Sequence, residues 1–316
     1  MKLFLQKIGL FLALVVAAFV VATWLPDLGN RGNMLYSLID KHERLDSIAG
    51  PRLIFVGGSN LLFGLDSRRV EEELGMPVVN LGMHAGAGLR FMLNHTDNLV
   101  REGDVVVLSP EYAHFYERSP STYDGQDELL TMVLDVYPAA RQDLSLAHWL
   151  SLYRYFPNYV GNKYFNFFRF VLKPKTRKGK FQVYMRDQLN PWGDVVGHLQ
   201  VKNQPFPAVG EEQFEVDSRV LQHLNRYAEA LREQGAQVYL TPTAFQASSY
   251  QNTQATVEAI AQAWKENIDI EVLGTPWRYR FPDDMCWDSP EHLNHYGREL
   301  RTRYLIEDLR PRLMQP

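Results

Sequence analysis

The chain has 316 residues, of which 46% are hydrophobic and 22% are charged, and its formal net charge is −4. This is the composition of a globular protein, and a slightly acidic chain has no overall attraction for nucleic acid, so we expect no nucleic-acid partner. The single cysteine, Cys286, excludes an intrachain disulfide, and nothing beside it in sequence indicates a reactive thiol.

Residues 8–25 form an uncharged apolar run of about the length that crosses a bilayer as a helix. Lys2 and Lys7 precede this run, and the positive-inside rule then predicts a cytoplasmic N-terminus and an exported body. The alternative is a cleaved signal peptide, but the run is long for one and its small-residue site is poor. We therefore predict a single-pass anchor over residues 1–29 in the cytoplasmic (inner) membrane, with residues 30–316 on the periplasmic side. The lipid bilayer is then the expected partner of residues 8–25.

Strands and helices alternate along most of the remaining chain. The patterns predict strands at 53–56, 77–81, 105–108, 237–241 and 268–273, and helices at 67–74, 89–100, 217–234, 253–265 and 297–309. This order predicts an α/β fold of three layers, a parallel sheet with helices on both faces, whose functional groups lie at the C-terminal ends of the strands. Residues 116–214 do not continue the alternation and are predicted to be an insertion into one domain.

Two short segments far apart in sequence carry the parts of a nucleophilic site. Ser59 follows the first predicted strand within Gly57-Gly58-Ser59-Asn60, and Asp288 and His292 arrive together near the end of the chain. A serine hydroxyl needs an imidazole to accept its proton and a carboxylate to orient that imidazole. Ser59, His292 and Asp288 are therefore the candidate catalytic residues.

These motifs, with the segment from Asn80 to Gly86, resemble the SGNH/GDSL hydrolase superfamily. More narrowly, they resemble the membrane-anchored SGNH-like proteins of cell-surface polysaccharide clusters, distant relatives of the alginate O-acetylation proteins and of the D-alanyl transfer protein of teichoic acid synthesis. The resemblance implies an SGNH/flavodoxin-like fold and a serine esterase or O-acyltransferase that acts on a cell-envelope polysaccharide or glycan. A membrane-embedded acyltransferase is a further partner that it suggests.

The chain departs from the family pattern in two ways. The usual Gly-x-Asn-Asp block is absent, because the strand at 105–108 runs into Ser109-Pro110-Glu111-Tyr112. The acid also precedes the histidine by four residues, so Glu291 remains an alternative to Asp288. Donors for an oxyanion are expected from backbone amides near Ser59 and from a glycine of the second motif, Gly86 in preference to Gly82. A side-chain donor to the oxyanion is expected from Asn60 or Asn80.

The predicted insertion and the segment after the third strand supply candidates for substrate binding. These candidates are Glu111 and Tyr112, and Asn190 and Asp194 in a turn-rich element that would close over the site. Aromatic residues between 153 and 170 precede Lys173, Lys175, Arg177, Lys178 and Lys180. Such a segment suits a membrane interface, sugar stacking or an anionic polysaccharide, and equally a packed core beside a solvated basic loop. No spacing of histidine, cysteine or glycine indicates a metal or a nucleotide cofactor, and we expect none.

Two classes of function remain open. The first is a serine-dependent ester hydrolase or O-acyltransferase, and both proceed through the same acyl-serine. The second is a catalytically silent SGNH-like scaffold that binds polysaccharide or a membrane acyltransferase, which the missing Gly-x-Asn-Asp block favours.

Overall fold

A parallel sheet of five strands forms the centre of the protein. The computed structural model describes residues 1–24, 32–116, 123–172, 180–204, 206–211 and 214–313. The strands lie in the order β2-β1-β3-β4-β6, and every neighbouring pair is parallel. Their bounds are β1 Leu53–Gly57, β2 Val78–Asn80, β3 Val105–Ser109, β4 Gln237–Leu240 and β6 Glu271–Val272. Two further short strands, β5 (Phe245–Gln246) and β7 (Arg280–Phe281), pair with each other.

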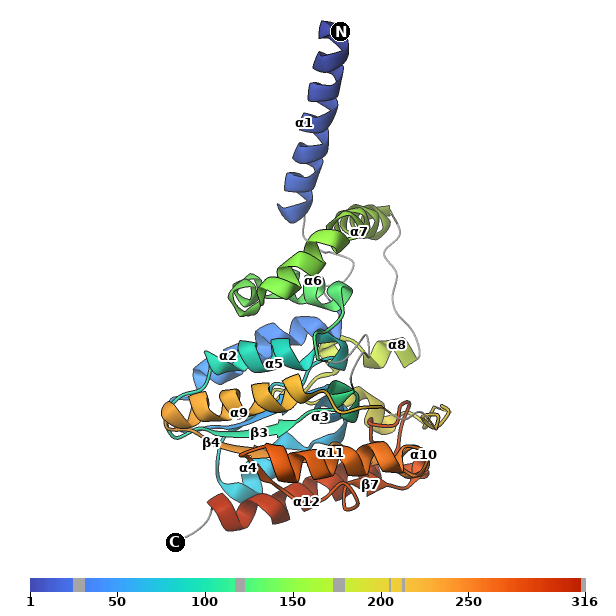
Figure 1. Cartoon of the computed structure of the whole chain (residues 1–316). Coiled ribbons are helices and arrows are strands. Elements are labelled where there is room, and N and C mark those ends of the chain that lie inside the picture. The colour runs from blue at the N-terminus through green and yellow to red at the C-terminus, as the bar shows by residue number, and fades with distance from the viewer. Residues whose placement is uncertain (25–31, 117–122, 173–179, 205, 212–213, 314–316) are drawn as a thin grey trace.

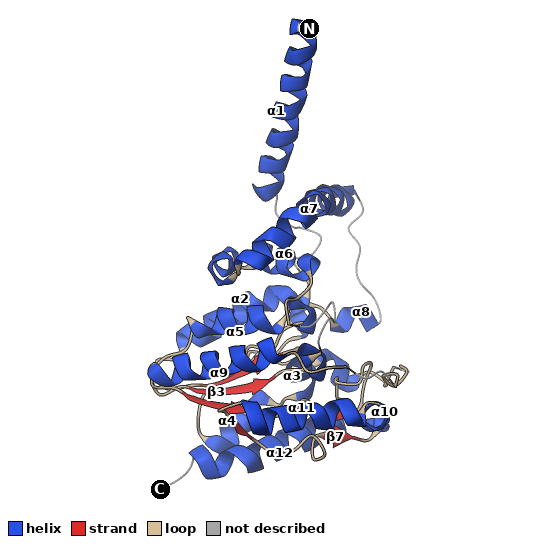
Figure 2. Cartoon of the chain, in the orientation of Figure 1, coloured by secondary structure: helices blue, strands red, loops and turns tan. Residues whose placement is uncertain are grey.

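Helices cover both faces of this sheet, which confirms the α/β class (Figure 1, Figure 2). One face packs against α2 (Ser37–Ser47), α5 (Leu89–Asp97), α9 (Ser218–Glu233) and α11 (Gln254–Asn267). The other face packs against α4 (Ser67–Leu74) and α12 (His295–Leu313). The remaining helices are α1 Lys2–Trp24, α3 Ser59–Gly64, α6 Asp127–Val136, α7 Leu146–Leu172, α8 Lys180–Val183 and α10 Ala247–Asn252.

The apolar residues of β1 explain this two-sided packing. Ile54 and Val56 belong to the core beneath α2, α5 and α9, whereas Leu53 and Phe55 belong to the core beneath α4 and α12. Successive side chains of a strand point to opposite faces, so a strand covered on both sides is apolar throughout. All five residues of β1 are buried.

The predicted helices and strands mostly appear with small differences at their ends. The helix α4 has the predicted bounds, because Asp66 caps its start and Gly75 (φ 68°) ends it in the left-handed conformation. The last predicted strand is shorter than expected, because only Glu271 and Val272 pair with β4. The sequence patterns missed α2, α3, α10 and the β5–β7 pair, and they predicted no helix at α6, α7 or α8.

The strand order reverses between β1 and β3, and this reversal positions the site. From β1 the chain crosses to β2 on one side, and then returns past β1 to β3 on the other. The carboxyl ends of β1 and β3 therefore lie side by side, with Gly57 opposite Ser109. In open parallel sheets this reversal opens a crevice at the carboxyl ends of the strands, where ligands bind.

The helix α1 stands apart from the α/β body (Figure 1). Its residues Lys2–Ala22 are long and apolar enough to cross a membrane. Between β3 and α9 the described residues form α6, α7 and α8 and add no strand to the central sheet. The proposed domain limits, 1–29 for the anchor and 116–214 for the insertion, remain predictions. The basic residues Lys173, Lys175, Arg177 and Lys178 lie outside the described residues.

Candidate active site

Three polar side chains form one hydrogen-bonded row beside the carboxyl end of β1. His292 Nε2 lies 2.9 Å from Ser59 Oγ, and His292 Nδ1 lies 2.7 Å from Asp288 Oδ1. Each of the three residues is at most 9% exposed. The structure therefore brings together the serine, histidine and aspartate that the sequence nominated, at distances suited to a nucleophile, its base and an orienting acid.

Two aromatic side chains hold the histidine and the aspartate in place. The ring of Phe63 stacks on His292 with 4.1 Å between ring centres, and Tyr184 Oη donates to Asp288 Oδ2 at 2.5 Å. Burial, and then the Asp288 carboxylate, raise the pKa of Tyr184, so its hydroxyl stays protonated as a donor. The sequence motifs indicated neither residue. Phe63 follows Ser59 by four residues on α3, whereas Tyr184 lies in a segment without a motif.

Glu291, the alternative acid, pairs with another carboxyl group. Its side chain is hydrogen-bonded to that of Glu111. Burial, together with the charge of Glu111, raises the pKa of Glu291 well above its usual range. Burial acts to raise the pKa of Glu111 as well, but the Glu291 hydrogen bond and the nearby His114 and His292 outweigh it and lower that pKa. Glu291 therefore holds a proton beside a Glu111 carboxylate.

Glu111 also contacts Ser59, the candidate nucleophile. Its Oε1 lies 3.1 Å from Ser59 Oγ and accepts a hydrogen bond from the Asn60 amide, also at 3.1 Å. Ser59 and Asn60 are the first two residues of α3, so their amides have no acceptor within the helix. Gly58 makes this approach possible, because a Cβ there would lie 2.3 Å from Glu111 Oε1. Of the four candidates for substrate binding, Glu111 is the one that the structure places against Ser59.

The side chain of Asn60 faces the protein interior and is fully buried. Its Nδ2 donates to the Ser109 carbonyl at 2.9 Å, and its Oδ1 accepts from Ser109 Oγ and from Arg301. Arg301 comes from α12, is fully buried, and also donates to the Asn60 carbonyl and to Ser109 Oγ. Burial lowers the pKa of Arg301 to about 10. Arg301 thus joins the ends of β1 and β3, a role for which the sequence offered no signal.

The second motif lies against the loop that carries Ser59. A Cβ on Gly82 would meet the Gly58 carbonyl oxygen at 3.1 Å, whereas Gly86 packs against Gln126 and Leu129 at α6. The Gly82 amide donates to Asn80 Oδ1, and Asn80 Nδ2 donates to the Leu61 carbonyl and to Asp194. The Gly86 amide donates to His84 Nδ1. All of these candidate oxyanion donors already have acceptors within the protein.

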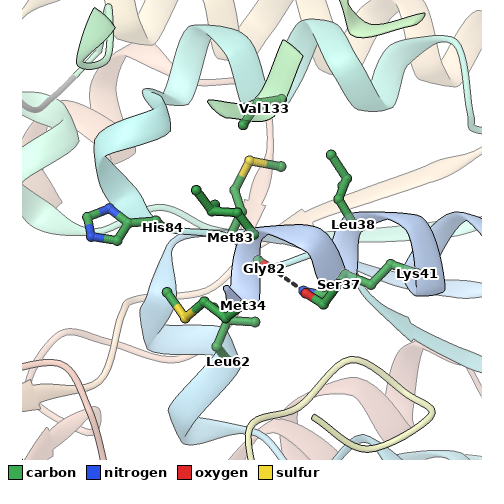
Figure 3. Close-up of a pocket in the computed structure, with 10 residues that line it drawn as sticks. Met34, Ser37, Leu38, Lys41, Leu62, Gly82, Met83, His84 and Val133 are labelled. Carbon is green, nitrogen blue, oxygen red and sulfur yellow. Dashed lines mark hydrogen bonds between the residues drawn. The ribbon is translucent and has the colours of Figure 1, made fainter. Parts of the chain in front are cut away.

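A buried lysine donates a hydrogen bond to this second motif. Lys41 of α2 is 3% exposed, and its Nζ donates to the Gly82 carbonyl oxygen (Figure 3). Apolar side chains surround this contact, among them Leu38, Leu62 and Met83. Burial lowers the pKa of Lys41 to about 7, against the opposing charges of Asp194 and Asp40. The carbonyl of Gly82 is thus held by a group that titrates near neutral pH.

The other three candidates for substrate binding have structural partners. Tyr112 is 1% exposed and packs against Phe245 and Trp264. Asp194 is fully buried and accepts hydrogen bonds from five groups, which belong to Ser67 (amide and hydroxyl), Asn80, Asn190 and Arg298. We therefore assign Tyr112 to the core, and Asn190 and Asp194 to a polar cluster that joins α4, β2 and α12.

Among the described residues, no group of three or more His, Cys, Asp or Glu side chains is placed to hold a metal ion. No protein-family model matches the chain, and the comparison with curated proteins finds no match.

Proposed function

We propose that the protein is a membrane-anchored serine esterase or O-acyltransferase of SGNH-like fold. The observation that carries this proposal is the continuous row from Ser59 Oγ through His292 to Asp288. Buried rows of this kind make a serine hydroxyl nucleophilic. Their position at the strand-order reversal adds support, because that is where open parallel sheets bind ligands.

The reaction follows from these contacts. Ser59 Oγ attacks the ester carbonyl while His292 Nε2 accepts the hydroxyl proton, and Asp288 stabilises the imidazolium that forms. The same proton then leaves with the departing alcohol, and an acyl-serine remains. Water or a sugar hydroxyl then attacks the acyl-serine, His292 accepts its proton, and Ser59 is released with its hydroxyl restored. Hydrolysis and transfer differ only in which of the two is the acceptor. The amides of Ser59 and Asn60, at the start of α3, are backbone donors for the developing oxyanion, and the Asn60 amide must first release Glu111.

We propose a glycan of the cell envelope as the acceptor or the ester substrate, and the periplasmic side of the inner membrane as the location. The glycan rests on the resemblance of the motifs to polysaccharide-modifying proteins. The location rests on the apolar helix α1 and on the lysines that precede its apolar core, Lys2 and Lys7.

Covalent labelling of the full-length protein in detergent tests the nucleophile. A fluorophosphonate probe followed by peptide mass spectrometry is expected to modify Ser59 in the wild type, and to modify neither Ser59→Ala nor His292→Ala at this position. His295→Ala is the matched control, because His295 lies three residues further on and is exposed. It is expected to label normally. Unlabelled wild-type protein with a native circular dichroism spectrum would count against the proposal.

A specific observation favours the second candidate function, a catalytically silent scaffold. The Asn60 amide, which lies beside Ser59 Oγ, already donates its hydrogen bond to the Glu111 carboxylate. A reacting carbonyl oxygen needs a donor at this place. A scaffold is expected to keep its binding partner in Ser59→Ala. An enzyme is expected to hydrolyse p-nitrophenyl acetate, or to transfer its acetyl group, as the wild type. The Ser59→Ala variant is expected to lose this activity.

A further inference from the structure

The helix α7 carries a stripe of exposed apolar residues at its N-terminal half. Leu146, Trp149, Leu150 and Tyr153 are 75%, 43%, 60% and 81% exposed. The spacing of three, four and seven residues places them on one face of the helix. We call these four residues the interfacial stripe. Single exposed apolar residues are ordinary, but a contiguous group marks a surface that contacts something else.

Polar contacts on another side of α7 fix the orientation of the helix. Tyr159 Oη donates to Asp135 Oδ1 at 2.5 Å, and Lys163 Nζ pairs with the same oxygen at 2.8 Å. Ser151 donates to Asp127, which also belongs to α6. Leu152, which lies toward α6, is 5% exposed. The interfacial stripe is consequently turned away from α6 and from the α/β body.

The same face of α7 continues onto the membrane helix. Val160 and Tyr164 follow Tyr153 by seven and eleven residues, so they lie on the face of the interfacial stripe. Val160 is buried, and Tyr164 Oη donates to the Ala18 carbonyl oxygen of α1 at 2.7 Å. Ala18 lies within the Lys2–Ala22 segment that is apolar enough to cross a bilayer. Figure 1 shows α7 at the end of α1 that faces the body.

The chemistry of the interfacial stripe matches the boundary of a bilayer. Tryptophan and tyrosine gather at membrane interfaces because their rings are apolar and their N–H and O–H groups reach water. An amphipathic helix that lies in this boundary buries one apolar face among the lipid chains. An aqueous surface would leave these four side chains exposed, whereas α7 contacts α1 near the end of the segment that is apolar enough to span a bilayer.

We propose that the interfacial stripe lies in the lipid bilayer that holds α1, with α7 running along the membrane surface. The protein then touches the membrane at two places, one spanning and one interfacial. This inference does not depend on the proposed reaction, since Ser59 and its partners take no part in it.

The test places an environment-sensitive fluorophore at single positions of the full-length protein in liposomes. Cys286→Ser removes the native thiol, and Leu150→Cys or Tyr153→Cys then carries the label. Asn162→Cys is the matched control, because it is exposed on α7 nine residues after Tyr153, and therefore on the opposite side of the same helix. We expect blue-shifted emission at positions 150 and 153 that lipids with brominated chains quench, and neither effect at position 162.

Two results would overturn the inference. Emission at positions 150 and 153 that resembles position 162 would place the interfacial stripe in water. Blue-shifted emission without quenching by brominated lipids would place it against protein, such as a second copy of the chain. Wild-type circular dichroism for each labelled variant ensures that either result reports on a folded molecule.

Discussion

Gly58→Ala is expected to displace Glu111 from the nucleophile. The backbone of Gly58 (φ −81°, ψ −165°) suits any residue, so the change adds no strain by itself. The new Cβ would lie 2.3 Å from Glu111 Oε1, and ordinary contact begins at 3.4 Å. The carboxylate must therefore move by about 1.1 Å (3.4 − 2.3), which breaks its 3.1 Å hydrogen bond from the Asn60 amide.

The size of the effect follows from the bond that is lost. A hydrogen bond to a charged group contributes about 1.5–3 kcal/mol, so Gly58→Ala is expected to lower the free energy of unfolding by about that amount. In a Glu111→Ala background there is no carboxylate to displace. The same change is then expected to be neutral, or to stabilise by about 0.4–1 kcal/mol because alanine restricts the unfolded chain.

Guanidinium unfolding of the wild type, the two single variants and the double variant measures this coupling. Near-ultraviolet circular dichroism reports on the α/β body in each full-length protein. Equal destabilisation by Gly58→Ala in both backgrounds would refute the argument that Gly58 exists to admit Glu111.

Two further predictions concern the acid of the row and the buried lysine. Asp288→Asn is expected to slow the reaction of Ser59 with a fluorophosphonate by roughly 10⁴-fold, because the imidazole loses its orienting acid. Glu291→Gln, which leaves the Asp288–His292 contact intact, is expected to change that rate by less than about tenfold. A larger loss of rate in Glu291→Gln than in Asp288→Asn would make Glu291 the acid. The pKa of Lys41 falls from 10.5 to about 7 on folding. As the pH rises, Lys41 therefore loses its proton in the folded state at a lower pH than in the unfolded state. The free energy of unfolding should therefore rise between about pH 7 and 10.5, by about 1.4 kcal/mol per unit, and Lys41→Met should remove this rise. The exposed Lys202→Met should leave it unchanged, and a rise that persists in Lys41→Met would contradict the assignment.

Local patterns in the sequence were sufficient for the five strands of the central sheet and for five of the helices that cover it, but not for α2. Capping residues such as Asp66 and Gly75 mark the ends of α4, and the apolar run of β1 marks a strand covered on both faces. The serine, histidine and aspartate were found because each stands in a short motif. Their meeting within 3 Å is a property of the fold that spacing alone does not give.

The surroundings of the site were not predictable in the same way. Glu111 reaches Ser59 because β1 and β3 pair in a register that sets Gly57 opposite Ser109. Arg301 lies on a helix with four other arginines, of which Arg303 and Arg310 are exposed and Arg298 is also buried. A lone sequence does not distinguish the buried from the exposed ones. Long-range pairing and the burial of single charges both depend on the assembled sheet. The contacts that Tyr112, Asn190 and Asp194 make within the protein depend on the assembled fold in the same way.

Arg301 of α12 holds the turn after β1, so the geometry of the site depends on the last helix of the chain. Asn60, which follows the nucleophile, is held by a residue 241 positions later. If the chain is translocated from its N-terminus, Ser59 emerges long before the helix that fixes its loop. A nascent or C-terminally shortened chain would contain the serine without its support, and also without His292. The proposed reactivity of Ser59 toward esters would thus begin only when the last helix has arrived and folded against the sheet.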